Sequence, residues 1–159
     1  MRCFFSGVAA ATVWLACGAE GGAADLAKID RAIAKQPAYQ TKAPRYCLLV
    51  FGPEAKSRVW LVLDGDAVYV DRNGNGDLTD PGERVPMPPL KASKHPLFQE
   101  EREVELGDIR EGDRTHTGLA LEQVRARRDV QPKDRDQREF VRQARDLPDG
   151  FMYYVRVSV

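Results

Sequence analysis

The sequence has few cysteines, few histidines and no net charge. Three cysteines and two histidines among 159 residues leave few ligands for a soft metal. The 24 basic and 24 acidic side chains cancel, and this balance argues against general binding to nucleic acids or anionic membranes, which attract a basic excess. Phosphate-binding loops, dinucleotide-binding fingerprints and the usual hydrolase motifs are also absent from the sequence. We therefore expect one globular domain with a solvated surface.

Long apolar runs are absent except near the start. Arg2 precedes an apolar stretch from about residue 3 to 17, and small residues follow it. This layout is typical of a secretory signal peptide, and the run is shorter than the ~20 residues of a membrane-spanning helix. We therefore expect no transmembrane span and an exported protein that is periplasmic, attached to the cell surface or secreted. Cleavage after Ala19 or after Ala24 would satisfy the preference for small residues.

The stretch "WLAC" offers a third way of processing the leader. It resembles a bacterial lipobox, in which Cys17 would carry a lipid anchor, although Trp14 stands where a lipobox usually has leucine. Cys3 is removed with the leader, and Cys17 is either removed or lipidated, so only Cys47 remains available and no intramolecular disulfide is expected. Cys47 lies in the apolar run "YCLLVF" and is expected to be buried.

The chain divides into a signal peptide (residues 1–24), a short helix with a linker (25–44) and a β-rich domain (45–159). Asp25 can cap the expected helix and Pro37 can end it. Its apolar residues recur at helical spacing, namely Leu26, Ile29 and Ile33.

Alternating and apolar runs predict strands over most of the third region. "RVWLVL" and "DAVYVD" read as a hairpin turning at Asp64-Gly65, and its apolar residues on both faces predict a central position covered on both sides. The proline-rich stretch 84–98 is expected to be irregular or edge-like. Further strands are expected over 102–109, 115–125 and 150–159, with a short charged helix over 132–148. Together these elements predict a mainly β (α+β) fold, either a small antiparallel sandwich or an open barrel, with a short helix near the N-terminus.

The loop "DRNGNGDLTDPGE", from Asp71 to Glu83, carries the clearest chemical pattern. Calcium takes six to eight oxygen ligands, and a loop supplies them when oxygen-bearing residues alternate and a glycine permits a sharp turn. Here Gly76 stands at loop position 6 and Leu78 at the apolar position 8. The candidate ligands are Asp71, Asn73, Asn75, the Asp77 carbonyl, Thr79 and Glu83.

This loop resembles those of EF-hands, dockerins and other bacterial extracellular calcium modules, and the resemblance implies calcium as the ligand. It covers under a tenth of the chain. The closing carboxylate is displaced, because Gly82 occupies position 12 and either Glu83 or Asp80 must replace the usual glutamate. The flanks read as strand and proline-rich chain, so an EF-hand domain with its helix pair is not expected. More loosely, the stretch is similar to exported bacterial proteins of unknown function.

The sequence leaves three interpretations open. The first is an exported, non-enzymatic β-rich module in which calcium has a structural role. The second is a metal-free binding or surface module, because Asn-Gly pairs also make good turns. The third is a hydrolase that uses His95 or His116 with acidic partners.

Overall fold

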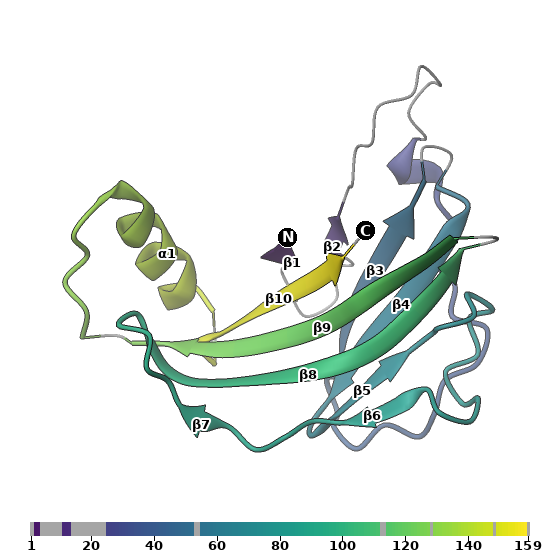
Figure 1. Ribbon diagram of the computed structural model, residues 1–159, viewed down its shortest axis with the longest axis horizontal. Coiled ribbons are helices and arrows are strands. Elements are labelled where there is room, and N and C mark those ends of the chain that lie inside the picture. Colours follow the sequence, from purple (N-terminus) through teal and green to yellow (C-terminus); the bar gives the residue numbers. More distant parts are fainter. Residues whose placement is uncertain are drawn as a thin grey trace.

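The computed structural model describes residues 2–3, 11–13, 25–52, 55–111, 114–127, 129–147 and 149–158. Figure 1 shows strands arranged in two layers with a helix at one end. In chain order the described elements are β1 (Arg2–Cys3), β2 (Ala11–Val13), the 3₁₀ helix η1 (Leu26–Lys28), β3 (Arg45–Phe51), β4 (Ser57–Asp64), β5 (Ala67–Val70), β6 (Arg84–Pro86), β7 (Lys91–Ala92), β8 (Phe98–Glu111), β9 (Arg114–Ala126), α1 (Arg135–Arg145) and β10 (Phe151–Ser158).

The strands form a β-sandwich, which confirms the predicted mainly β fold. One sheet has the order β2-β3-β4-β5-β6 and the other β1-β10-β9-β8-β7. Their pairings are antiparallel apart from the parallel β2–β3 pair. Inward-facing side chains of both sheets make the core between them, including Leu49, Leu61, Val70, Leu106, Leu121 and Val155.

The hairpin of β4 and β5 is covered on both faces, as its sequence predicts. Val59, Leu61 and Leu63 face the core between the sheets, whereas Trp60 and Val62 belong to a second apolar cluster on the outer face of the same sheet. That outer cluster is covered by residues that precede β3 in the chain, among them Ile29, Ile33 and Tyr39.

The hairpin turn lies one residue later than predicted. Asp64 pairs with Ala67 across the strands, so Gly65 and Asp66 make the turn instead of Asp64 and Gly65. Gly65 supplies the positive φ of +64° that this turn needs. The buried Asp64 side chain instead binds the chain that precedes β3, which is a tertiary contact that the local pattern does not contain.

The predicted helix over residues 25–37 is mostly wrong. Only Leu26–Lys28 is helical, as a single 3₁₀ turn that the Asp25 side chain caps by accepting from the Ala27 amide. Asp30 then accepts from the Ala32 amide at 2.9 Å, a local bond that competes with helix continuation. Ile29 and Ile33 still pack on the protein, but they do so from an irregular segment.

The second half of the domain follows its sequence pattern closely. The predicted strand over 115–125 is β9, and the charged helix is α1, which packs Phe140, Val141 and Ala144 on the outer face of β9 and β10. In β10, Tyr153 and Val155 face the core between the sheets as their alternation predicts. Val159 lies outside the described residues.

Cys47 is fully buried in the core between the sheets, as expected. The positions predicted for leader processing, Cys17, Ala19 and Ala24, lie outside the described residues. Among the residues that are described, no helix has the length and apolar character to cross a membrane.

Candidate metal centre

The loop from Asp71 to Glu83 connects β5 to β6 and starts and ends at neighbouring points. The Val70 amide donates to the Glu83 carbonyl at 2.9 Å, and the Asp71 amide donates to the Trp60 carbonyl of β4 at 2.9 Å. The β-ladder therefore continues into both ends of the loop. This arrangement places two carboxylates, twelve positions apart in the chain, at the base of one loop.

Asp71 and Glu83 are both buried, with 1% and 3% of their surfaces exposed. Asp71 Oδ2 accepts from the Gly76 amide at 3.1 Å. Asp71 Oδ1 and both oxygens of Glu83 are buried without a hydrogen-bond donor. A carboxylate oxygen that is buried without a hydrogen bond destabilises the folded state, because its lost contacts with water are not replaced. These three oxygens are the least satisfied acceptors of the loop.

The electrostatics of the pair reflect this burial. Desolvation, together with the negative charge of Asp71, raises the pKa of Glu83 to about 7, and the Arg72 backbone offsets only part of the effect. Desolvation also raises the pKa of Asp71, against opposing hydrogen bonds from backbone amides, of which that of Gly76 is the largest. When two neighbouring buried carboxylates are both ionised, their negative charges repel each other. A cation bound between them would compensate this repulsion.

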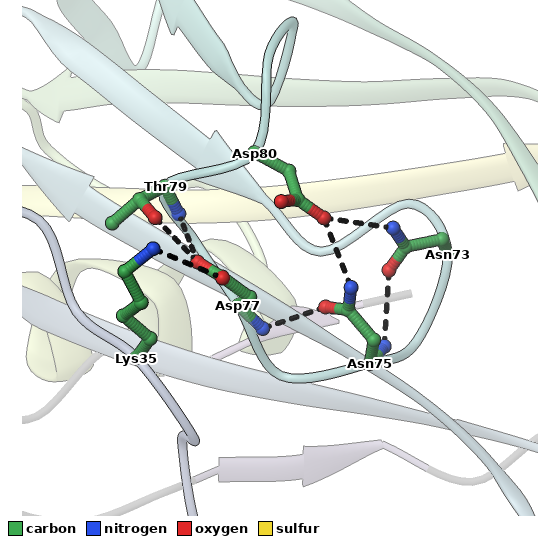
Figure 2. Close-up of polar contacts among 6 residues, drawn as sticks. All are labelled: Lys35, Asn73, Asn75, Asp77, Thr79 and Asp80. Atoms are coloured by element: carbon green, nitrogen blue, oxygen red, sulfur yellow. Dashed lines mark hydrogen bonds and ion pairs between the residues drawn. The ribbon is translucent and has the colours of Figure 1, made fainter.

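The rim of the loop is a series of side-chain turns (Figure 2). The Asn75 amide donates to Asn73 Oδ1 at 3.0 Å, and the Asp77 amide donates to Asn75 Oδ1 at 2.6 Å. The side-chain nitrogens of both asparagines donate to one oxygen of Asp80, at 3.1 and 2.9 Å. Asp80 therefore connects the side chains of Asn73 and Asn75. Each asparagine oxygen keeps a second lone pair for another partner.

Asp77 and Thr79 lie on the opposite side of the loop, where a residue from outside the loop joins them. Thr79 donates to Asp77 Oδ1 through its hydroxyl at 2.6 Å and through its amide at 2.9 Å, and these bonds lower the pKa of Asp77. Lys35 Nζ lies 3.3 Å from Asp77 Oδ2 (Figure 2). Both oxygens of the Asp77 side chain thus bind Thr79 or Lys35. In calcium-binding loops the residue at this position contributes its main-chain carbonyl, which these contacts do not occupy.

The residues present fit a hard cation. The loop offers two buried carboxylates, two amide oxygens, a main-chain carbonyl and a hydroxyl, which are the ligand types that calcium prefers. Within the described ranges no group of three or more histidine, cysteine, aspartate or glutamate side chains converges. The candidate site therefore depends on neutral oxygens as much as on charge.

Of the two candidates for the closing carboxylate, Glu83 has the more suitable environment. Its oxygens are buried and without donors, whereas Asp80 accepts from both asparagines. Gly82 before it has a φ of +88° and open space where a Cβ would stand, so the chain turns there without obstruction.

The two histidines lie at opposite ends of the long β8–β9 hairpin. His95 packs against Phe98 at the start of β8, with ring centres 4.3 Å apart. His116 lies opposite Ile109, near the far end of β8, and stacks on Phe51 at 4.4 Å. At ~3.3 Å per strand residue the separation is on the order of 30 Å, so the structure does not bring the two histidines together.

Sequence reasoning missed two features of the loop. The first is the burial of Asp71 and Glu83, a property of the folded chain that a local pattern cannot reveal. The pairing of Lys35 with Asp77 spans 42 positions, and only the opposite charges hint at it. Neither a protein-family model, nor a curated protein, nor a solved structure matches this chain.

Proposed function

We propose that the loop from Asp71 to Glu83 binds a calcium ion, and that this ion stabilises an exported β-rich module without taking part in a reaction. The observation that supports this most is the buried pair of Asp71 and Glu83, with three carboxylate oxygens that lack donors. A divalent cation is the partner that compensates two such charges at once.

Each proposed ligand has a defined role. Asp71 and Glu83 would supply the charge, and Asn73 and Asn75 would add their side-chain oxygens. Asp77 would contribute its main-chain carbonyl, and Thr79 would contribute its hydroxyl or hold a water. Export to a calcium-rich exterior is consistent with the leader that the sequence predicts, and it supplies the ion at millimolar concentration.

The affinity is expected to be weak. Among loop positions 1, 3 and 5 only Asp71 is charged, and the closing Glu83 is displaced by one residue. Low ligand charge corresponds to dissociation constants near ~10⁻⁴–10⁻³ M, as in extracellular modules.

Calcium titration of the purified protein by calorimetry tests the proposal. We expect a saturable heat with about one ion per chain and a midpoint in this range. Asp71→Asn should remove the heat, whereas Asp66→Asn, at an exposed carboxylate outside the loop, should leave it unchanged. A wild-type protein without a heat of binding in several millimolar calcium would contradict the proposal.

One observation favours the alternative, in which the loop is only a turn of a metal-free binding or surface module. The asparagine, aspartate and threonine side chains of the rim already satisfy one another and the loop backbone. In that case calcium and magnesium would bind equally poorly. The buried Asp71–Glu83 pair would then have no explanation, which is why we favour the calcium site.

A further inference from the structure

The N-terminal segment, defined here as residues 25–41, covers the outer face of β3, β4 and β5. Apart from its single 3₁₀ turn and an isolated bridge at Lys35 it has no regular secondary structure. Its Ile29, Ile33 and Tyr39 pack on the outer apolar cluster, which includes Trp60 and Val62. A segment without a β-ladder of its own is held only at particular contacts, so the place of each contact matters.

The middle of the N-terminal segment is attached to the candidate calcium loop. The Lys35 amide donates to the Gly76 carbonyl at 3.1 Å, and the Leu78 amide donates to the Lys35 carbonyl at 3.0 Å. These bonds form an isolated parallel bridge between Lys35 and Asp77, and the Lys35 ammonium adds an ion pair with Asp77 at 3.3 Å. Among the residues that the structure describes, this is the bridge that joins the segment to the loop.

Asp71, a proposed calcium ligand, also binds Gly76, the glycine that contacts Lys35. The Gly76 amide donates to Asp71 Oδ2 at 3.1 Å while the Gly76 carbonyl accepts from Lys35. The contact is close, because a Cβ on Gly76 would lie 3.2 Å from the Ala34 nitrogen. Leu78, 1% exposed, packs in the same cluster as the isoleucines of the segment. The loop conformation that aims Asp71 inward is therefore the one that presents Gly76 and Leu78 to the segment.

The ends of the N-terminal segment are attached elsewhere. The Gln40 and Thr41 amides donate to Asp64 at 2.6 and 2.7 Å. Near the other end, Arg58 donates to the Asp30 carbonyl at 2.8 Å. Neither contact involves a residue of the loop. The contacts at the two ends therefore serve as an internal control for the contact at Lys35.

From these contacts we infer that cation binding in the loop fixes the middle of the N-terminal segment against the sheet, so that calcium controls access to the outer apolar face. The inference rests on the proposed calcium site. A ligand that binds only the closed arrangement lowers the open population by a factor of 1 + [Ca²⁺]/Kd. With ~1.5 mM calcium and a dissociation constant of ~0.3 mM this factor is about six.

Amide hydrogen exchange, resolved by residue and measured in chelator and in 1.5 mM calcium, tests the inference. We expect the Lys35 and Leu78 amides to exchange about sixfold more slowly with calcium, while the Gln40 and Thr41 amides change little. Lys35→Pro removes the donor to Gly76 and should abolish the calcium effect on Leu78. Its matched control, Lys35→Ala, keeps the backbone donor and should retain most of the effect.

Calorimetry on the same samples separates the two possible failures. A clear heat of calcium binding with unchanged exchange at Lys35 and Leu78 would overturn the inference and leave the calcium site standing. An equal slowing at Thr41 would also overturn it, because the effect would then be global. Absence of a binding heat would remove the proposed function and this inference together.

Discussion

Two buried aspartates at the two ends of β5 have opposite environments. Asp64 precedes the turn into β5 and Asp71 follows β5, and both are at most 1% exposed. Asp64 accepts from the Gln40 amide, the Thr41 amide and the Thr41 hydroxyl at 2.6–2.7 Å. Asp71 has one oxygen without a donor and a second buried carboxylate, that of Glu83, beside it.

The difference extends to the pKa values. Burial alone would raise the pKa of Asp64, but its hydrogen bonds from residues 40 and 41 outweigh burial and lower it. Burial raises the pKa of Asp71, and the backbone amides around it, that of Gly76 foremost, do not compensate. One carboxylate is a satisfied structural contact, whereas the other keeps an oxygen without a donor, and this is the basis of the proposed calcium site. Four predictions test this distinction.

The largest effect is expected at the satisfied carboxylate. Asp64→Ala leaves three donors without their acceptor and creates a cavity, which should lower the free energy of unfolding by roughly 3 kcal/mol. The loss should be the same in chelator and in calcium, because Asp64 is outside the loop. Urea denaturation measures it, and Asp66→Ala, at an exposed carboxylate in the same turn, is the control with little expected change. A loss below 1 kcal/mol would show that the three bonds add little.

The second prediction concerns pH without calcium. The pKa of Glu83 is raised from 4.5 to about 7 in the folded state, so the folded state binds more protons than the unfolded state between these values. Stability in chelator should therefore fall as pH rises from 4.5 to 7, by roughly 2–3 kcal/mol, and level off above. Denaturation at several pH values measures this change.

Glu83→Gln isolates the contribution of this group from other titrating side chains. Because the glutamine does not titrate, the variant should lose most of the fall in stability. If wild-type protein and variant have parallel profiles between pH 4.5 and 7, Glu83 is not the group with the raised pKa.

The third prediction is a gain in stability from a substitution at the unsatisfied carboxylate. Asp71→Asn removes one of the two buried charges and introduces an amide that can donate to Glu83. In chelator at pH 7.5 we expect about 1 kcal/mol of added stability, opposite in sign to Asp64→Ala. The same variant should show no stabilisation by calcium. A destabilised variant in chelator would break the contrast between the two aspartates.

The smallest effect is expected on the rim. Asp80→Asn keeps a side-chain oxygen that can accept from the side-chain nitrogens of Asn73 and Asn75, but the loss of charge weakens both hydrogen bonds. We expect calcium affinity to fall only about 2–5-fold, because the rim orients ligands without supplying the buried charge. Glu83→Gln in the same titration should abolish measurable binding. If Asp80→Asn abolishes binding and Glu83→Gln does not, Asp80 is the closing carboxylate.

Local pattern was sufficient for much of this fold. Alternation places the inward residues of β9 and β10, and helical spacing places Phe140, Val141 and Ala144 of α1, because each element buries one regular face. It failed where a distant contact decided the conformation. The chain predicted as a helix over 25–37 is helical only at Leu26–Lys28, and further on Lys35 bonds to the distant loop.

For the candidate site, the spacing of loop residues identified the region and its oxygen ligands. It did not reveal that Asp71 and Glu83 are the buried carboxylates, because the burial of a side chain depends on the folded chain around it. The sequence left Glu83 and Asp80 as alternatives for the closing carboxylate. The structure adds a reason to prefer Glu83, since the Glu83 oxygens lack donors whereas one oxygen of Asp80 accepts from both asparagine side chains.

Thermal unfolding of wild-type protein in chelator and in ~1.5 mM calcium tests the central claim most directly. Binding with a dissociation constant of ~0.3 mM contributes about RT ln 6, or ~1 kcal/mol, which raises the melting temperature by roughly 3–5 °C for a domain of this size. We predict that shift for wild type and for Asp66→Asn, and its absence for Asp71→Asn. Superimposable wild-type curves in chelator and in several millimolar calcium would contradict the account.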